Sequence, residues 1–252
     1  MNKTILVTGA TSGFGKAIAI EFAKNGFNVI ITGRRKERLS ELEKELSKTG
    51  QGKILSLNFD VRKSDEVKTA IENLPQEWKK IDILVNNAGL AAGSEHIYQG
   101  NIDDWERMID TNLTGLLYMT KAIAPLMIEA NKGHIINIGS IAGKEPYENG
   151  NVYCATKAAV KSLSKCMRID LLKHNIKVTC IEPGMAETEF ALVRFHGDVE
   201  KAKNVYKGID AMTEYDIAQI VYWCATLPPH LCINELEVTP TQQATIGYNY
   251  RK

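Results

Sequence analysis

The sequence lacks a charge excess and long apolar runs, and these two absences exclude several classes of protein. Its 252 residues carry 31 Lys and Arg against 30 Asp and Glu, which gives a formal net charge of +1. Proteins that bind nucleic acid or anionic membranes carry a basic excess or patch, so we expect neither partner. No stretch approaches the ~18 apolar residues of a membrane-spanning helix, and the first residues are apolar over too short a stretch for a signal peptide.

Cysteine is scarce as well, and its spacing excludes two kinds of stabilising site. None of the five cysteines forms a C-x-x-C pair, and an odd number does not suit a disulfide framework. We therefore expect no metal site, and a protein that works in the reducing cytoplasm. The cysteines are Cys154, Cys166, Cys180, Cys224 and Cys232.

Short β-rich runs alternate with longer stretches of helical periodicity along the whole chain. In residues 38–46, for example, Leu39, Leu42 and Leu46 recur at spacings of three and four. This alternation predicts βαβ units, whose right-handed crossovers place helices on both faces of the sheet. We predict one α/β domain over residues 1–252, with a doubly wound, mostly parallel sheet of seven strands. The strands are expected at residues 4–8, 28–32, 53–58, 81–85, 133–138, 177–181 and 235–238.

One segment, residues 185–212, interrupts this rhythm. It is polar, carries Gly197 and Gly208, and delays the seventh strand. Insertions of this kind are usually functional in a compact domain, so we predict a substrate-binding lid over residues 185–212.

A glycine-rich loop follows the first predicted strand and precedes a helix. Its glycines, at positions 9, 13 and 15, have the spacing G-x-x-x-G-x-G. Glycines permit a tight turn and let a pyrophosphate approach backbone N–H groups at a helix N-terminus. The alternative is a glycine turn and helix cap that binds nothing. We predict dinucleotide binding by Gly9, Thr11, Ser12, Gly13, Phe14 and Gly15.

The end of the second predicted strand indicates which dinucleotide is bound. An NAD site normally places an acid there to hold the adenosine ribose, but this sequence has Arg34 and Arg35. Guanidinium groups pair well with a phosphate monoester, so we predict NADP(H). The alternative is that both arginines cap a helix or face solvent.

Ser140, Tyr153 and Lys157 form a candidate catalytic set. Tyr153 and Lys157 are four residues apart and share one face of a helix, and Ser140 ends the fifth predicted strand. A ketone reduced by hydride needs a proton, which Tyr153 would supply, while the Lys157 ammonium would lower the pKa of Tyr153. The Ser140 hydroxyl would hold the same oxygen. Taken alone, a Tyr–Lys pair at this spacing is more often an exposed helix pair; the glycine loop upstream and Ser140 favour the catalytic interpretation.

Two further motifs, NNAG at residues 86–89 and PG at residues 183–184, accompany the glycine loop and the candidate catalytic set. Together they resemble the short-chain dehydrogenase/reductase family across essentially the whole chain. Within that family the sequence is similar to the NADP-dependent 3-hydroxy acid dehydrogenases, also described as serine or L-allo-threonine dehydrogenases. The resemblance rests on segments such as TGRRKERL at residues 32–39 and IEPG at residues 181–184.

The resemblance implies a Rossmann fold, a homotetramer and an oxidoreductase acting on a small-molecule substrate. The expected reaction transfers a hydride between NADP(H) and a 3-hydroxy acid or β-hydroxy amino acid. Further roles are implied for single residues. Asn112 would complete the catalytic set through a water, although it could also be a satisfied polar residue in a helix. Cofactor contacts are implied for Asp60, Val61, Asn87, Ala88, Gly89, Tyr153, Lys157, Pro183, Gly184 and Thr188.

The substrate contacts follow less directly from the sequence. We expect Ser140 and Tyr153 to hold the reacting oxygen, and Arg194 in the predicted lid to hold a substrate carboxylate. A surface arginine is the alternative for Arg194, and the acidic run at residues 187–189 leaves the substrate orientation open. Two other functions remain open at this point: a broad carbonyl or 3-oxoacyl-thioester reductase, and a non-catalytic protein that senses NADP.

Overall fold

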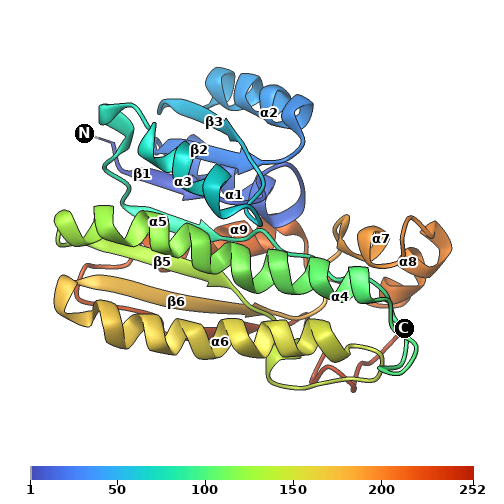
Figure 1. The fold of residues 1–252 in the computed structure, drawn as a ribbon. Helices are drawn as coiled ribbons and strands as arrows, with labels where there is room; N and C mark the ends of the chain where they lie inside the picture. Colours follow the sequence, from blue (N-terminus) through green and yellow to red (C-terminus); the bar gives the residue numbers. More distant parts are fainter. Residues whose placement is uncertain (1) are drawn as a thin grey trace.

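A seven-stranded sheet forms the centre of the protein, shown here as a computed structural model (Figure 1). The structure describes residues 2–252, so the first residue of the predicted domain lies outside the described range. The strand order is β3-β2-β1-β4-β5-β6-β7, and all neighbours pair in parallel. The order reverses between β1 and β4, which confirms the predicted doubly wound α/β domain. The strands are β1 (Thr4–Val7), β2 (Asn28–Gly33), β3 (Ile54–Asn58), β4 (Ile83–Asn86), β5 (Gly133–Ile138), β6 (Ile176–Pro183) and β7 (Glu235–Val238).

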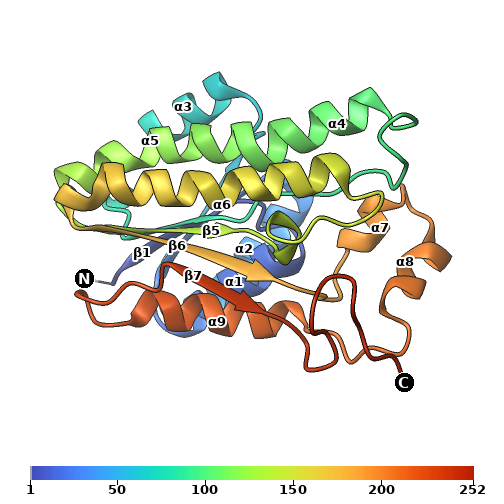
Figure 2. The same cartoon turned by 90° about the horizontal axis from the view of Figure 1, so that it is seen from below.

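Helices cover both faces of the sheet, because the inner strands bury side chains on both sides. Ile5 and Val7 of β1 join one hydrophobic core and Leu6 joins the other, as the alternation along a strand requires. Helices α1, α2 and α9 pack against the first face, and α3, α5 and α6 against the second (Figure 2). The helices are α1 (Gly13–Lys24), α2 (Lys36–Thr49), α3 (Ser64–Glu72), α4 (Ile102–Ile109), α5 (Gly115–Glu129), α6 (Asn151–Leu171), α7 (Phe190–Arg194), α8 (Val199–Tyr206) and α9 (Glu214–Thr226).

Strand β6 is longer than the prediction of residues 177–181. It pairs with β5 on one side and with β7 on the other, and the pairing continues to Pro183 opposite Val238. The extension brings Pro183 and Gly184 to the carboxyl end of the sheet, where the ends of parallel strands form the binding crevice of doubly wound folds.

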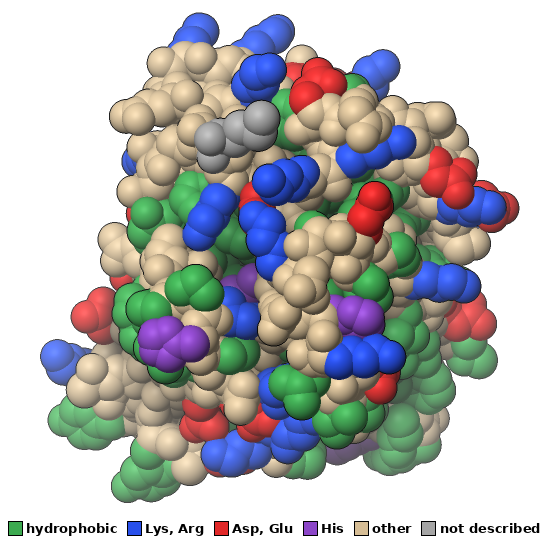
Figure 3. Space-filling view, turned by 90° about the vertical axis from the view of Figure 1, so that its left-hand side faces the viewer, with side chains coloured by type: hydrophobic (Ala, Val, Ile, Leu, Met, Phe, Trp, Pro, Cys, Tyr) green, Lys and Arg blue, Asp and Glu red, His purple; other side chains and the backbone are tan. Residues whose placement is uncertain are grey.

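The two ends of the sheet differ in character. Helices α7 and α8 lie beyond the carboxyl ends of the strands, on the right of Figure 1. Lys3, Lys53 and Lys132 directly precede three strands, and Figure 3 shows basic side chains gathered at this opposite, amino end. Within residues 2–252, no helix combines the length and the apolar character needed to cross a membrane.

A buried histidine lies at the amino end of β5. His134 is 3% exposed, and its Nε2 atom lies 2.7 Å from the Thr179 hydroxyl of β6. Burial lowers the pKa of His134 to about 3, and the positive charge of Lys177 adds to the effect. The imidazole is therefore neutral in the folded protein at neutral pH.

This lowered pKa predicts a loss of stability on acidification. The unfolded chain takes up a proton at His134 near pH 6.5, whereas the folded protein resists it down to about pH 3. Stability from this group is complete above pH 6.5 and falls below it, by about 2 kcal/mol between pH 7 and pH 5. Urea unfolding of His134→Val at both pH values should show a smaller difference than the wild type. The same change at the exposed His230 serves as control, and an unchanged difference in His134→Val would contradict the prediction.

Candidate active site

A pocket of about 400 Å³ opens at the carboxyl end of the sheet, where the strand order reverses. It receives residues from the ends of β1, β2, β4, β5 and β6 and from the segment after β6. Most of the residues that the sequence predicts as a site meet there, although they come from across the chain. They are Gly9, Thr11, Ser12, Gly13, Phe14, Arg34, Arg35, Asp60, Val61, Asn87, Ala88, Gly89, Ser140, Tyr153, Lys157, Pro183, Gly184 and Thr188.

The glycine loop at the floor of the pocket has the geometry of a phosphate cradle. Gly9 and Gly13 adopt left-handed backbone angles, with φ of +66° and +50°. A Cβ at Gly9 would lie 2.9 Å from the Ala88 Cα, which leaves no room for a side chain. The loop leads into the N-terminus of α1, whose first turn has no acidic residue, so the arrangement fits a pyrophosphate.

Gly15 and Asn87 hold this loop in place. Gly15 does not line the pocket, and a Cβ there would collide with the Asn87 side chain and the Gly9 carbonyl. The Asn87 amide donates to the Thr8 carbonyl at 2.8 Å, and the Thr8 hydroxyl accepts from the backbone of Asn87 at 2.9 Å. Gly15 therefore permits close packing of α1, and its contact with a cofactor stays a prediction.

Positive side chains gather at the end of the pocket beside β2 and β3. Arg34, Arg35 and Arg107 all line it, and the sequence reasoning missed Arg107 because nothing local distinguishes it from other charged residues of α4. Burial lowers the pKa of Arg34, partly offset by Asp60, which lies 3.8 Å from its guanidinium. Asp60 is itself held by Arg62 at 2.6 Å. The surplus of cations fits an added phosphate group.

Ser140, Tyr153 and Lys157 stand at the other end of the pocket. Lys157 lies one turn after Tyr153 on α6, with its ammonium nitrogen 5.9 Å from the centre of the Tyr153 ring. That nitrogen donates to the Ile138 carbonyl of β5 at 2.8 Å, which fixes the lysine against the sheet. The Ser140 hydroxyl lies 3.4 Å from the Pro183 carbonyl.

The pKa of Tyr153 differs from the sequence-based expectation. Burial raises it above its ordinary value, and a hydrogen bond from Ser140 offsets only part of the rise. Burial also lowers the pKa of Lys157 to about 8. The expected lowering by Lys157 is not found: desolvation of the buried phenol dominates, and the lowering comes from Ser140 and Arg194. Tyr153 is therefore held in its protonated form.

Asn112 lies behind the pocket, in a π-helical turn (Asp110–Thr114) between α4 and α5. Its side chain accepts from the Leu90 backbone at 2.8 Å and donates to the Leu90 carbonyl at 2.8 Å and to the Thr156 hydroxyl at 3.0 Å. It does not line the pocket. Asn112 is nevertheless close to the site, because its Oδ1 and the Lys157 Nζ lie beside the same residue, Gly89. A Cβ added at Gly89 would be 3.2 Å from Asn112 Oδ1 and 3.6 Å from Lys157 Nζ.

The segment at residues 185–212 lines one side of the pocket through residues 186–193, which include most of α7. A Cβ added at Gly13 of the glycine loop would lie 3.5 Å from the Thr188 Cβ, and the Phe190 ring centre lies 5.5 Å from that of Tyr153. Glu189, Phe190 and Val193 line the pocket and were missed by the sequence reasoning, which had no signal for the side of α7 that faces inward.

Arg194 points to a different place from the one expected. Its guanidinium donates to the Tyr147 hydroxyl at 2.6 Å and to the carbonyls of Gly93 at 3.3 Å and Asn149 at 3.2 Å. It is absent from the residues that line the main pocket. In this structure Arg194 ties α7 to neighbouring loops, and its contact with a substrate stays a prediction.

A doubly wound sheet with a glycine loop at the reversal point and a Tyr–Lys pair on α6 defines a dinucleotide-dependent oxidoreductase. Comparison with known families agrees, because the short chain dehydrogenase family matches residues 3–198. The chain therefore belongs to the short-chain dehydrogenase family, and the family predicted from the motifs is confirmed.

Individual relatives are similar over nearly their whole length. The NADP-dependent 3-hydroxy acid dehydrogenase YdfG of Escherichia coli (strain K12) is 49% identical over 98% of this chain and 99% of its own. Serine 3-dehydrogenase of Agrobacterium fabrum (strain C58) is 47% identical over 100% of both chains. The closed form of a serine dehydrogenase complexed with NADP+ superposes with a TM-score of 0.92, at 50% identity and 99% coverage of each chain.

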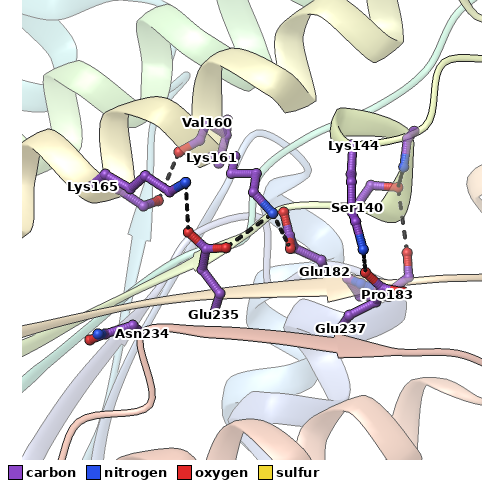
Figure 4. A network of polar contacts seen from close by, with 12 residues as sticks. Ser140, Lys144, Val160, Lys161, Lys165, Glu182, Pro183, Asn234, Glu235 and Glu237 are labelled. Atoms are coloured by element: carbon purple, nitrogen blue, oxygen red, sulfur yellow. Dashed lines mark hydrogen bonds and ion pairs between the residues drawn. The ribbon is translucent and has the colours of Figure 1, made fainter.

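Beneath the site, a charged network ties α6 to β6 and β7 (Figure 4). Lys161, one turn beyond Lys157, lies 2.8 Å from the Glu182 carboxylate and 3.1 Å from that of Glu235. The Glu182 side chain is only 3% exposed and directly precedes Pro183. The network therefore joins the helix that carries Tyr153 to the strand end beside Ser140.

Replacing Lys161 should lower the free energy of unfolding more than neutralising the buried Glu182. Lys161→Met leaves the Glu182 carboxylate buried without a counter-ion, and we expect a loss of about 3 kcal/mol or more. Glu182→Gln leaves Lys161 paired with Glu235, so we expect a smaller loss. Urea unfolding of both variants at neutral pH measures the difference, with the exposed Lys68→Met as control. Equal losses of unfolding free energy in Lys161→Met and Glu182→Gln would contradict the prediction, because they would show that the buried Glu182 carboxylate does not need Lys161 as its counter-ion.

Proposed function

We propose that the protein transfers a hydride between NADP(H) and a 3-hydroxy acid or β-hydroxy amino acid. The observation that carries this proposal is the single pocket with Ser140, Tyr153 and Lys157 at one end and Arg34 and Arg35 at the other. The names of relatives at 47% and 49% identity over the whole chain support the same reaction and cofactor. A broad carbonyl reductase and a non-catalytic sensor become outcomes of the test.

The residues that would hold NADP(H) divide along the pocket. Backbone N–H groups of the glycine loop would face the pyrophosphate, and Arg34 and Arg35 would pair with the ribose phosphate. Lys157 and Pro183 lie at the far end, where the nicotinamide half would lie. When bound, the cofactor donates or accepts the hydride and, in its oxidised form, brings a positive charge.

The chain's own residues supply the proton and the orientation. Tyr153, held protonated by burial, would donate its hydroxyl proton to the oxygen of a reacting carbonyl. The Ser140 hydroxyl would hold the same oxygen by a hydrogen bond. Lys157 would hold the nicotinamide ribose and counter the charge left on Tyr153. Phe190 and Val193 would keep water out of this end of the pocket.

Three further features belong to the proposal. Residues 185–212 would act as the lid, a role supported by the lining of the pocket by residues 186–193. The chain would assemble as a homotetramer, supported by exposed apolar side chains on α6 and directly after it: Ile169 is 74% exposed and Leu172 is 72% exposed. It would work in the cytoplasm, as five free thiols suggest.

An assay of NADP+ reduction tests the reaction directly. We expect NADPH to form with at least one of L-serine, L-allo-threonine, 3-hydroxyisobutyrate and 3-hydroxypropionate, and Tyr153→Phe to lower kcat at least about a hundredfold, because the acid/base group is lost. The absorbance of NADPH gives the rate, with NAD+ as a control. NADPH binding without turnover of any of the four would favour a carbonyl reductase or a sensor instead.

Cofactor choice should depend on the two arginines. We expect Arg34→Ala combined with Arg35→Ala to lower the ratio of kcat/KM for NADP+ to that for NAD+ at least about tenfold, since charge-assisted hydrogen bonds to the phosphate are lost. Lys36→Ala, next in sequence but outside the pocket lining, is the matched control. An unchanged ratio in the double variant would remove both arginines from phosphate recognition.

A further inference from the structure

One carboxylate bridges the segment after β6 to the start of α2, across the mouth of the pocket. The Glu189 carboxylate, directly before α7, lies 3.0 Å from the Arg38 guanidinium through both of its oxygens. It also accepts from Arg35 at 3.2 Å. These partners are 151 and 154 residues away in sequence, so the contact joins two distant parts of the chain.

The two arginines of this bridge have different surroundings. Arg35 lines the pocket and donates to the hydroxyls of Thr11, at 2.7 Å, and Ser12, at 2.6 Å, in the glycine loop. Arg38 does not line the pocket. Within residues 2–252, Glu189 is the one side chain with which Arg38 forms a hydrogen bond or ion pair. Arg38 is therefore free to hold Glu189 even when Arg35 faces a bound phosphate.

Glu189 lies between two residues that touch the rest of the site. Thr188 lies beside the glycine loop, where a Cβ added at Gly13 would be 3.5 Å from its own Cβ, and the Phe190 ring lies against the Tyr153 ring. An interaction that fixes Glu189 therefore also helps to fix its two neighbours, Thr188 beside the glycine loop and Phe190 beside Tyr153. Burial alone would raise the pKa of Glu189, but hydrogen bonds from Arg38 and Arg35 outweigh it and leave the pKa below its usual value.

We infer that Glu189 is a positioning residue, and that its ion pair with Arg38 is a clasp that holds the lid segment, residues 185–212, over the cofactor pocket. Arg35, shared between Glu189 and the glycine loop, connects the clasp to the site of the ribose phosphate. The inference rests on the proposed use of NADP(H), but the clasp itself is a property of the protein without cofactor.

Hydrogen exchange of the lid segment in the cofactor-free protein tests the clasp without any activity. We expect Arg38→Gln and Glu189→Gln each to speed exchange of residues 188–197 about fivefold, the worth of a well-formed surface ion pair. The double variant should exchange no faster than Glu189→Gln alone, because Arg38 then has no carboxylate left to lose. Arg38→Lys keeps the charge and should stay close to the wild type.

A second ion pair offers a matched control. Lys16 and Glu45 lie 3.3 Å apart, with side chains 45% and 47% exposed, against 44% and 45% for Arg38 and Glu189. Glu45→Gln should therefore leave exchange of the lid segment unchanged. Unchanged exchange in both Arg38→Gln and Glu189→Gln would overturn the clasp, as would equal acceleration by Glu45→Gln.

Kinetics and binding separate the clasp from the simpler possibility that Glu189 only tunes the charge of the phosphate site. For the clasp, Arg38→Gln should raise KM for the hydroxy acid about fivefold and change kcat less than about twofold. A Glu189→Gln variant that binds NADP+ more tightly with unchanged lid exchange would instead show charge tuning and overturn the clasp. Failure of the wild type to bind NADP+ in calorimetry would refute the proposed function while leaving the exchange result readable.

Discussion

The close approach of two backbone loops at the reversal of the strand order is the constraint on which the rest of the site depends. The loop after β1 lies so near the loop after β4 that a single Cβ at Gly9 would lie 2.9 Å from the Ala88 backbone. Thr8 and Asn87 fasten the two loops by hydrogen bonds. Because α1 starts directly afterwards, its free N–H groups face the crevice between the two halves of the sheet.

Helix α6 supplies the second fixed element, and it does so with one stripe of residues. Tyr153, Lys157 and Lys161 follow each other at intervals of four, so they share a face. The first two enter the pocket, and the third joins the charged network with Glu182 and Glu235. The helix is thus held against β6 one turn from Lys157.

Sequence patterns predicted the local parts of this site and could not predict its long-range parts. The glycine loop, Arg34 and the Tyr153–Lys157 pair are each set by spacing within a few residues, and the structure brings them to one pocket. Arg107 and the bridge from Glu189 to Arg38 depend on tertiary contacts across many residues, which leave no local pattern.

Tyr153 and Arg194 show that burial and side-chain direction also could not be predicted from the sequence. The raised pKa of Tyr153 depends on burial, which spacing does not report. Arg194 has the charge expected of a carboxylate ligand, but the fold directs its donors to Tyr147 and to backbone carbonyls.

The opposite pKa shifts of Tyr153 and Lys157 have one main cause, the burial of both side chains. Burial disfavours both charges, so it keeps the phenol protonated and weakens the hold of Lys157 on its proton. Without cofactor Tyr153 therefore keeps the proton that the proposed carbonyl reduction would use. Alcohol oxidation requires Tyr153 to take a proton instead, and this needs additional positive charge in the pocket. The oxidised cofactor carries such a charge, so the same buried pair would serve both directions, with the redox state of the cofactor selecting between them.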